Sequence, residues 1–207
     1  MNRLPDRPDL DHLKKQARQL LNGLQRGDAA ALDRIRRFLP AARGLDDAAL
    51  QARGLRLHDT QSALAREYGF VSWSKLADFV AARRALGDDP ARRLRQWLAL
   101  VYPGDVSGGN DGARPEAAAR LLDELAGLRA ALAADPWTAC AIGDESALRR
   151  ATTSDRGWLT RPGGPLNLPP LVAVTHSALG RLPDWQARLH ACARYLLDAG
   201  VDPNQSI

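Results

Sequence analysis

The spacing of apolar residues is what most constrains the fold of this 207-residue chain, because it follows the period of a helix almost throughout. Between residues 9 and 26, leucines and alanines recur at steps of three and four, which gives one apolar helix face. No segment has the alternating β-branched and aromatic residues that a sheet needs. The sequence therefore predicts an all-α protein, with further helices at 28–39, 59–69, 72–84, 90–102, 115–132 and 145–152.

Polar and proline residues mark where these helices begin. An Asp or Ser before the first helical turn accepts a backbone N–H, and proline at the first helical position lacks a donor that would be unpaired anyway. Phe70 and Trp73 flank the junction between two of the helices, so we expect both side chains to fill the core there. The predicted starts are Asp9, Asp28, Asp59, Ser72, Asp89-Pro90, Pro115-Glu116 and Asp135-Pro136.

Charge is distributed unevenly along the chain. Residues 1–86 contain 16 basic and 10 acidic residues, a net charge of +6, whereas the remaining residues contain 13 basic and 14 acidic ones, a net charge of −1. We therefore expect a basic N-terminal helical domain at 1–86. Linking helices follow at 87–135, with a mobile loop predicted at 104–114, where glycines are frequent and large apolar residues are rare.

Several classes of protein are excluded by composition. Charged residues from Asp9 to Arg18 interrupt every apolar stretch near the N-terminus, so neither a signal peptide nor a membrane span is expected, and the protein is predicted to be cytoplasmic. The two cysteines, at positions 140 and 192, are too few for a disulfide scaffold, and their spacing matches no zinc site.

No recognisable active site or cofactor motif is present. The four histidines lack nucleophile or carboxylate partners at motif spacing, and no glycine-rich phosphate loop occurs. Oxygen ligands at 105, 107, 109, 111 and 116 have calcium-loop spacing, but Asn110 replaces the required glycine, so we interpret the segment as a solvated loop. We expect no cofactor, no metal and no catalysis, although an enzyme whose site is hidden in sequence stays a third interpretation.

The C-terminal third carries the most specific pattern. Residues 196–204, Leu-Leu-Asp-Ala-Gly-Val-Asp-Pro-Asn, resemble the end of an ankyrin repeat, and Pro169-Pro170-Leu171-Val172 is similar to the start of one. A weaker copy begins at Pro136-Trp137 and continues through Gly143-Asp144. Together with the Gly27-Asp28 junction and the run from Ala65 to Trp73, this organisation resembles bacterial ankyrin-repeat proteins with an N-terminal helical domain.

The resemblance implies an N-terminal helical bundle followed by a short, degenerate ankyrin solenoid of about two repeats at 136–207. Pro169 and Val172 replace the hydroxyl and imidazole that normally tie adjacent repeats, and the last repeat is about ten residues too long, with the surplus near 180–186. Such solenoids bind other proteins on a surface of turns and one helix face. The expected protein-binding residues are Arg161, Leu166, Asn167, Thr175, His176 and Trp185.

Nucleic-acid binding by the basic N-terminal helices is the alternative function. Residues 61–69 resemble the first helix and turn of a helix-turn-helix. The register of the next helix does not fit, because the apolar residues fall at Leu76 and Phe79 instead of at 75 and 78. Nucleic acid is therefore not the partner that the sequence favours.

The last predicted helix presents a large apolar set, including Leu189, Cys192, Leu196 and Leu197. One preceding repeat is too small to cover it, and terminal repeats need a polar outer face. We expect either that the insert or a second copy of the chain covers this helix, which would make the C-terminal repeat a surface for self-association, or that more repeats follow.

Overall fold

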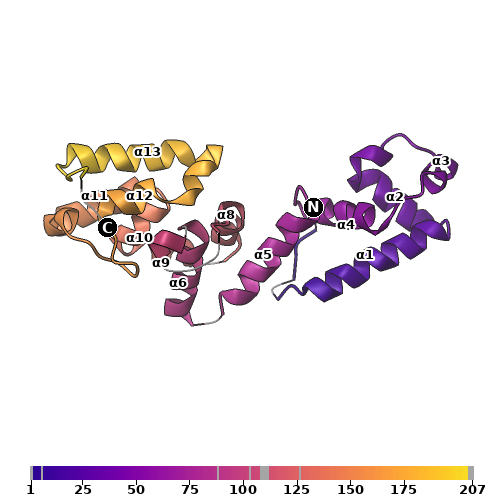
Figure 1. Ribbon diagram of the computed structural model, residues 1–207, viewed down its shortest axis with the longest axis horizontal. Helices are drawn as coiled ribbons and strands as arrows, with labels where there is room; N and C mark the ends of the chain where they lie inside the picture. The colour runs from indigo at the N-terminus through magenta and orange to yellow at the C-terminus, as the bar shows by residue number, and fades with distance from the viewer. Residues whose placement is uncertain are drawn as a thin grey trace. The chain divides into compact units, whose positions relative to one another are not determined.

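The computed structural model describes residues 2–5, 7–87, 89–102, 104–107, 112–125 and 127–204. These residues form helices and connecting loops and contain no β-strand, which confirms the all-α prediction. The chain divides into two compact units, Met1–Arg84 and Ala85–Ile207 (Figure 1). The predicted linking segment 87–135 and the segment 136–207 both belong to the second unit.

Short helices and 3₁₀ turns make up both units. The first unit holds α1 (Leu10–Gln25), α2 (Ala29–Phe38), the 3₁₀ turn η1 (Pro40–Ala42), α3 (Asp47–Ala52), α4 (Leu57–Glu67) and nearly all of α5 (Trp73–Ala85). The second unit holds α6 (Pro90–Val101), α7 (Gly104–Ser107), α8 (Pro115–Glu124), α9 (Leu128–Ala133), α10 (Pro136–Ala141), α11 (Glu145–Ser154), η2 (Arg156–Thr160), α12 (Pro170–Thr175), η3 (Ala178–Arg181) and α13 (Pro183–Asp198).

Most of the predicted helix caps are confirmed. The carboxylates of Asp28, Asp89 and Asp135 each accept a backbone N–H three residues further on, at 3.0, 2.7 and 3.1 Å. The Ser72 hydroxyl caps α5 in the same way. The prediction for Asp59 is wrong, because α4 begins two residues earlier and the Asp59 carboxylate reaches back to the N–H of Arg56 at 2.8 Å. A carboxylate at the third helical position favours this arrangement.

Three predicted segments differ in the structure. The helix expected at 115–132 is two helices, because the backbone leaves the helical path at Leu125, which is extended, and Gly127, with a φ of +80°, precedes the second helix. The stretch between Gly44 and Gly54, for which we predict no helix, contains α3. Residues 104–107 of the expected mobile loop form α7, whereas 108–111, and with them part of the candidate calcium loop, lie outside the described residues.

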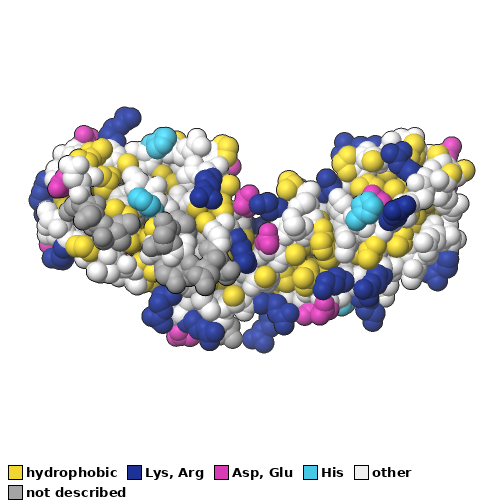
Figure 2. Space-filling model, in the orientation of Figure 1, with side chains coloured by type: hydrophobic (Ala, Val, Ile, Leu, Met, Phe, Trp, Pro, Cys, Tyr) yellow, Lys and Arg dark blue, Asp and Glu magenta, His cyan; other side chains and the backbone are white. Residues whose placement is uncertain are grey.

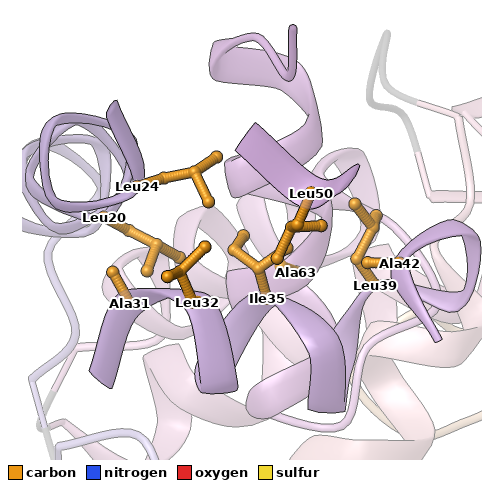
Figure 3. Close-up of a cluster of buried hydrophobic side chains, with 9 residues drawn as sticks. All are labelled: Leu20, Leu24, Ala31, Leu32, Ile35, Leu39, Ala42, Leu50 and Ala63. Atoms are coloured by element: carbon orange, nitrogen blue, oxygen red, sulfur yellow. The ribbon is translucent and has the colours of Figure 1, made fainter. Parts of the chain in front are cut away.

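The core of the first unit is built by α1, α2 and α4, which pack against one another. Figure 3 shows leucine, isoleucine and alanine side chains from these helices, η1 and α3 pointing into one cluster. A Cβ atom on Gly23 would lie 2.9 Å from the Cβ of Ala31, so only glycine lets α1 approach α2 this closely. The clustered residues are Leu20, Leu24, Ala31, Leu32, Ile35, Leu39, Ala42, Leu50 and Ala63.

The aromatic pair predicted at the α4–α5 junction is partly in the core. Phe70 is 8% exposed, and its ring centre lies 5.3 Å from that of Phe79 on α5. Trp73 is half-buried. Phe70 therefore fills the angle between the two helices, as predicted, whereas Trp73 is only partly buried.

Buried aromatic side chains with satisfied polar ends organise the second unit. The indole N–H of Trp97 on α6 donates to the carbonyl oxygen of Ala118 on α8 at 3.0 Å. The hydroxyl of Tyr102 donates to the carbonyl oxygen of Ala173 on α12 at 2.6 Å. Buried polar groups need such partners, so these bonds hold α6 against α8 and tie Tyr102, the residue after α6, to α12.

Two consecutive helix pairs, α10–α11 and α12–α13, form the C-terminal part of the second unit. Within it α10 packs on α12, and α11 packs on α13 (Figure 1). Of the predicted surplus at 180–186, the first two residues end η3 and residues 183–186 form the first turn of α13. The η3 turn packs on α13 and buries Ala178 and Leu179. Leu189, Cys192 and Leu196 of α13 are all buried within this single chain, whereas Leu197 is 47% exposed.

Candidate protein-binding surface

The connection between η2 and α12 is a tight turn that we call the finger, residues 161–168. The N–H of Gly163 donates to the carbonyl of Leu168 at 3.1 Å, and the N–H of Leu168 donates back to Gly163 at 3.0 Å. Gly164 and Asn167 have positive φ values of +68° and +50°. Glycine and asparagine tolerate this conformation, so the local sequence favours the turn.

The indole of Trp137 on α10 supports the finger. Its N–H donates to the carbonyl oxygen of Arg161 at 3.3 Å, and its ring lies edge-on to that of Trp158, 5.9 Å between ring centres. A Cβ atom on Gly163 would lie 2.5 Å from the Trp137 ring. The backbone of the finger therefore rests directly on the indole, which only glycine permits.

Three of the predicted partner-binding residues, Arg161, Leu166 and Asn167, lie on the finger. Arg161 is exposed, and its guanidinium donates to the Asp155 carboxylate at 2.7 Å. The backbone N–H of Gly157 and this guanidinium both lower the pKa of Asp155. Leu166 is half-buried, and Asn167 is exposed at the tip. The structure thus brings these three residues together on one supported loop.

Thr175 and His176 lie at the end of α12, and both are exposed. The Thr175 hydroxyl donates its proton to the carbonyl oxygen of Leu171 at 2.9 Å and lies 3.1 Å from Nδ1 of His176. The hydroxyl has one proton, so it accepts from Nδ1–H, and the Nε2 atom of His176 stays available to another molecule. Both residues line a hollow of about 460 Å3 against α13.

Trp185, the sixth predicted binding residue, is buried in the first turn of α13. Its residue surface is only 8% exposed, and the guanidinium groups of Arg129 and Arg188 each lie 5.5 Å from its ring centre. Arginine is attracted to the face of an indole, so these cations shield the ring from solvent. The prediction of Trp185 as a protein-binding residue is therefore corrected: its indole is buried and covers the core.

Several residues of this region were not among the predicted binding residues. Arg181 in η3, together with Gln186 and His190 in α13, lies on the same hollow as His176. Gln186 and His190 are four residues apart on a helix, so one exposed face was foreseeable. Their meeting with Arg181 depends on the path of η3, which no short-range pattern predicts.

The described residues also give negative findings on metals and membranes. No three His, Cys, Asp or Glu side chains among them come close enough to hold a metal ion. Within the same part of the chain, every helix is too short or too polar to cross a membrane. Cys140 and Cys192 are buried free thiols, and burial raises the pKa of each.

Comparison with known proteins gives no relative for this chain. No family model, no curated protein and no solved structure matches it. The assignment of function therefore depends on the geometry of the second unit.

Proposed function

We propose that the second unit is a protein-recognition module of the ankyrin-repeat type, without catalysis, that presents the finger to a partner protein. The order of elements supports the proposal: α10 and α12 pack side by side, α11 and α13 pack behind them, and the finger joins one pair to the next. Stacked helix pairs with projecting turns are the arrangement that solenoid proteins use for binding.

The observation that carries the proposal is the support of the finger by Trp137. The paired backbone bonds between Gly163 and Leu168 and the indole beneath them hold Arg161 and Asn167 in fixed positions at the surface. A loop that is already ordered loses little conformational entropy on binding, so more of its contact energy becomes affinity.

Contacts between the helix pairs also support a solenoid. Pro169 and Val172 lack the side chains that the ankyrin family uses to tie repeats. Here the hydroxyl of Ser177 donates to the carbonyl oxygen of Ala141 at 2.8 Å, and the hydroxyl of Tyr102 donates to the carbonyl oxygen of Ala173 on α12. Both carbonyls are buried, so these bonds can perform the same tying function.

Photo-crosslinking from the full-length protein tests the proposal. A photoreactive amino acid placed at Leu166 or Asn167 is expected to give one reproducible protein adduct in cells that make the protein. The same group at Ala30, which is exposed on α2, serves as the control. Protein adducts that form equally from all three positions, or from Ala30 alone, would reject the finger as the recognition surface.

Nucleic-acid binding by the first unit is the second candidate, because this unit has a net charge of +6. Some of its basic side chains are held in ion pairs, such as Arg34 with Glu67 and Arg84 with Asp9, and the net charge already counts these acidic partners. Binding of labelled duplex DNA at increasing salt separates the two functions. Phosphate contacts predict an affinity that falls steeply with salt, whereas recognition by the finger does not involve DNA.

A further inference from the structure

A hollow of about 460 Å3 lies between the end of α12, η3 and α13, and we call it the α12–α13 hollow. Buried side chains of Val174 and Leu189 contribute to its apolar part. Exposed side chains of His176, Arg181, Gln186 and His190 contribute its polar part. Its volume falls within the range of about 300 to 1,000 Å3 that is usual for ligand sites.

Every ionisable side chain that lines this hollow is basic. They are His176 on α12, Arg181 on η3 and His190 on α13, and no carboxylate is among the lining residues. Figure 2 shows exposed histidine side chains on the second unit. Basic side chains from three different elements, and no carboxylate, thus meet at the same hollow.

Of these three side chains, Arg181 attracts an anion most strongly, because an arginine is always charged. Arg149 and Arg161 in the same unit are paired with Glu145 and Asp155. Among the described residues, by contrast, Arg181 has no ion-pair partner. Its guanidinium is therefore free to bind a carboxylate from another molecule through two parallel hydrogen bonds.

His176 and Gln186 add directional contacts to that charge. The bond between Thr175 and His176 fixes Nδ1 as a donor, which leaves Nε2 as the atom that can meet a ligand. When the ring is protonated, Nε2 donates to a carboxylate oxygen. The amide of Gln186 can donate to a carboxylate or to the backbone of a bound peptide.

We infer that the α12–α13 hollow binds an acidic segment of a partner protein, with carboxylates on Arg181 and the histidines and an apolar side chain against Leu189. The inference rests on the proposed protein-recognition function and adds the chemistry of the partner. The hollow is distinct from the finger, because Arg161, Leu166 and Asn167 do not line it.

Fluorescence anisotropy with the full chain tests the inference. The probes are a fluorescein-labelled peptide of glutamates around a central leucine and the same peptide with every glutamate replaced by glutamine. We expect the glutamate peptide to bind, and Arg181→Gln to weaken its binding about tenfold, because the charged contact between guanidinium and carboxylate is lost. His190→Gln is also expected to weaken the binding of the glutamate peptide.

Two exposed arginines provide matched controls for the loss of charge, Arg150→Gln on α11 and Arg18→Gln on α1. Both lower the net charge as Arg181→Gln does, and neither residue lines the hollow. We expect each control to change the affinity less than about twofold. Melting temperatures of all four variants check that the fold is unchanged.

The histidines locate the bound peptide independently. Two lie in each unit, His12 and His58 in the first and His176 and His190 in the second. We expect the imidazole NMR signals of His176 and His190 to shift as the glutamate peptide is added, while those of the other pair stay in place. Each signal is assigned with the corresponding His→Gln variant.

Three results would overturn the inference: no binding of the glutamate peptide, equal binding of the glutamine peptide, or equal weakening by Arg181→Gln and Arg18→Gln. Inorganic phosphate that displaces the peptide at equal concentration would also overturn it, because the hollow would then be a general anion site. None of these results affects crosslinking from Leu166, so failure here and failure of the proposed function are distinguishable.

Discussion

Arg34 on α2 donates its Nε proton to the buried carboxylate of Glu67 on α4 over 2.6 Å, and the Asn2 amide donates to the other carboxylate oxygen over 2.8 Å. The backbone N–H of Asn2 also donates to the Glu67 carbonyl. One carboxylate therefore holds together the N-terminal segment and two helices.

Replacing Arg34 is expected to destabilise the first unit. Arg34→Gln leaves the buried Glu67 carboxylate without its charged partner, which costs about 2 kcal/mol of unfolding free energy. Arg18→Gln, on the exposed side of α1, should change it by less than about 0.5 kcal/mol. Urea unfolding measures both, and equal effects of the two variants would show that the ion pair contributes nothing.

A methyl group at Gly143 should be tolerated poorly. Gly143 has a φ of +61°, and its added Cβ would lie 2.9 Å from the Arg188 Cβ and 3.2 Å from the Leu189 nitrogen. Gly200 has a φ of +90° and open space around it. We expect Gly200→Ala to cost about 1 kcal/mol and Gly143→Ala about 2 kcal/mol more, by thermal unfolding. Equal losses would mean that α13 simply moves away from Gly143.

Removing the Tyr102 hydroxyl tests the bond between α6 and α12. Tyr102→Phe leaves the buried Ala173 carbonyl without its partner, so we expect a loss of about 1 to 2 kcal/mol. Tyr195→Phe is the matched control, since the Tyr195 ring is half-buried under the Arg149 guanidinium at 4.5 Å. Tyr195→Phe should lower the unfolding free energy by less than about 0.5 kcal/mol in the same urea experiment.

Alkaline pH should destabilise the second unit. Burial raises the pKa of Cys192 to about 12, and it raises the pKa of Cys140 and of Tyr102 well above their ordinary values. In unfolded chains thiols ionise near pH 8.5 and tyrosines near 10. The folded state therefore keeps protons that the unfolded state releases, and the unfolding free energy falls as pH rises above about 9. Urea unfolding at pH 8 and pH 10.5 measures the fall; a flat profile would contradict it.

The two aromatic residues at the α4–α5 junction should differ in their contribution to stability. Phe70→Ala removes a buried ring that contacts Phe79 and is expected to cost about 3 kcal/mol. Trp73→Ala removes a half-buried ring, so we expect about half that loss. If instead Trp73→Ala abolishes DNA binding and leaves the melting temperature unchanged, the first unit has the alternative function.

Local features of the fold were predictable because they depend on neighbouring residues. The caps at Asp28 and Asp135 need only an N–H three positions away. The break at Gly127 was not predicted, because the leucine period continues across it and glycine is tolerated within helical patterns. Helix α3 was missed because it is six residues long and buries only Leu50, so tertiary packing decides its presence.

The binding surface was predictable only where one loop supplies it. Arg161, Leu166 and Asn167 are neighbours in sequence and stay neighbours in space. The burial of Trp185 depends on Arg129, more than fifty positions earlier, and no short-range pattern connects the two. The α12–α13 hollow likewise needs the path of η3, which the apolar spacing of the insert does not specify.

The bond from Tyr102 to Ala173 has a consequence for protein engineering. A fragment that starts at α10 would keep both helix pairs and the finger, yet it would leave the Ala173 carbonyl exposed where Tyr102 and α6 now cover it. The fragment to express on its own is thus the whole of 85–207, and a finger grafted onto another scaffold needs α6 to be included.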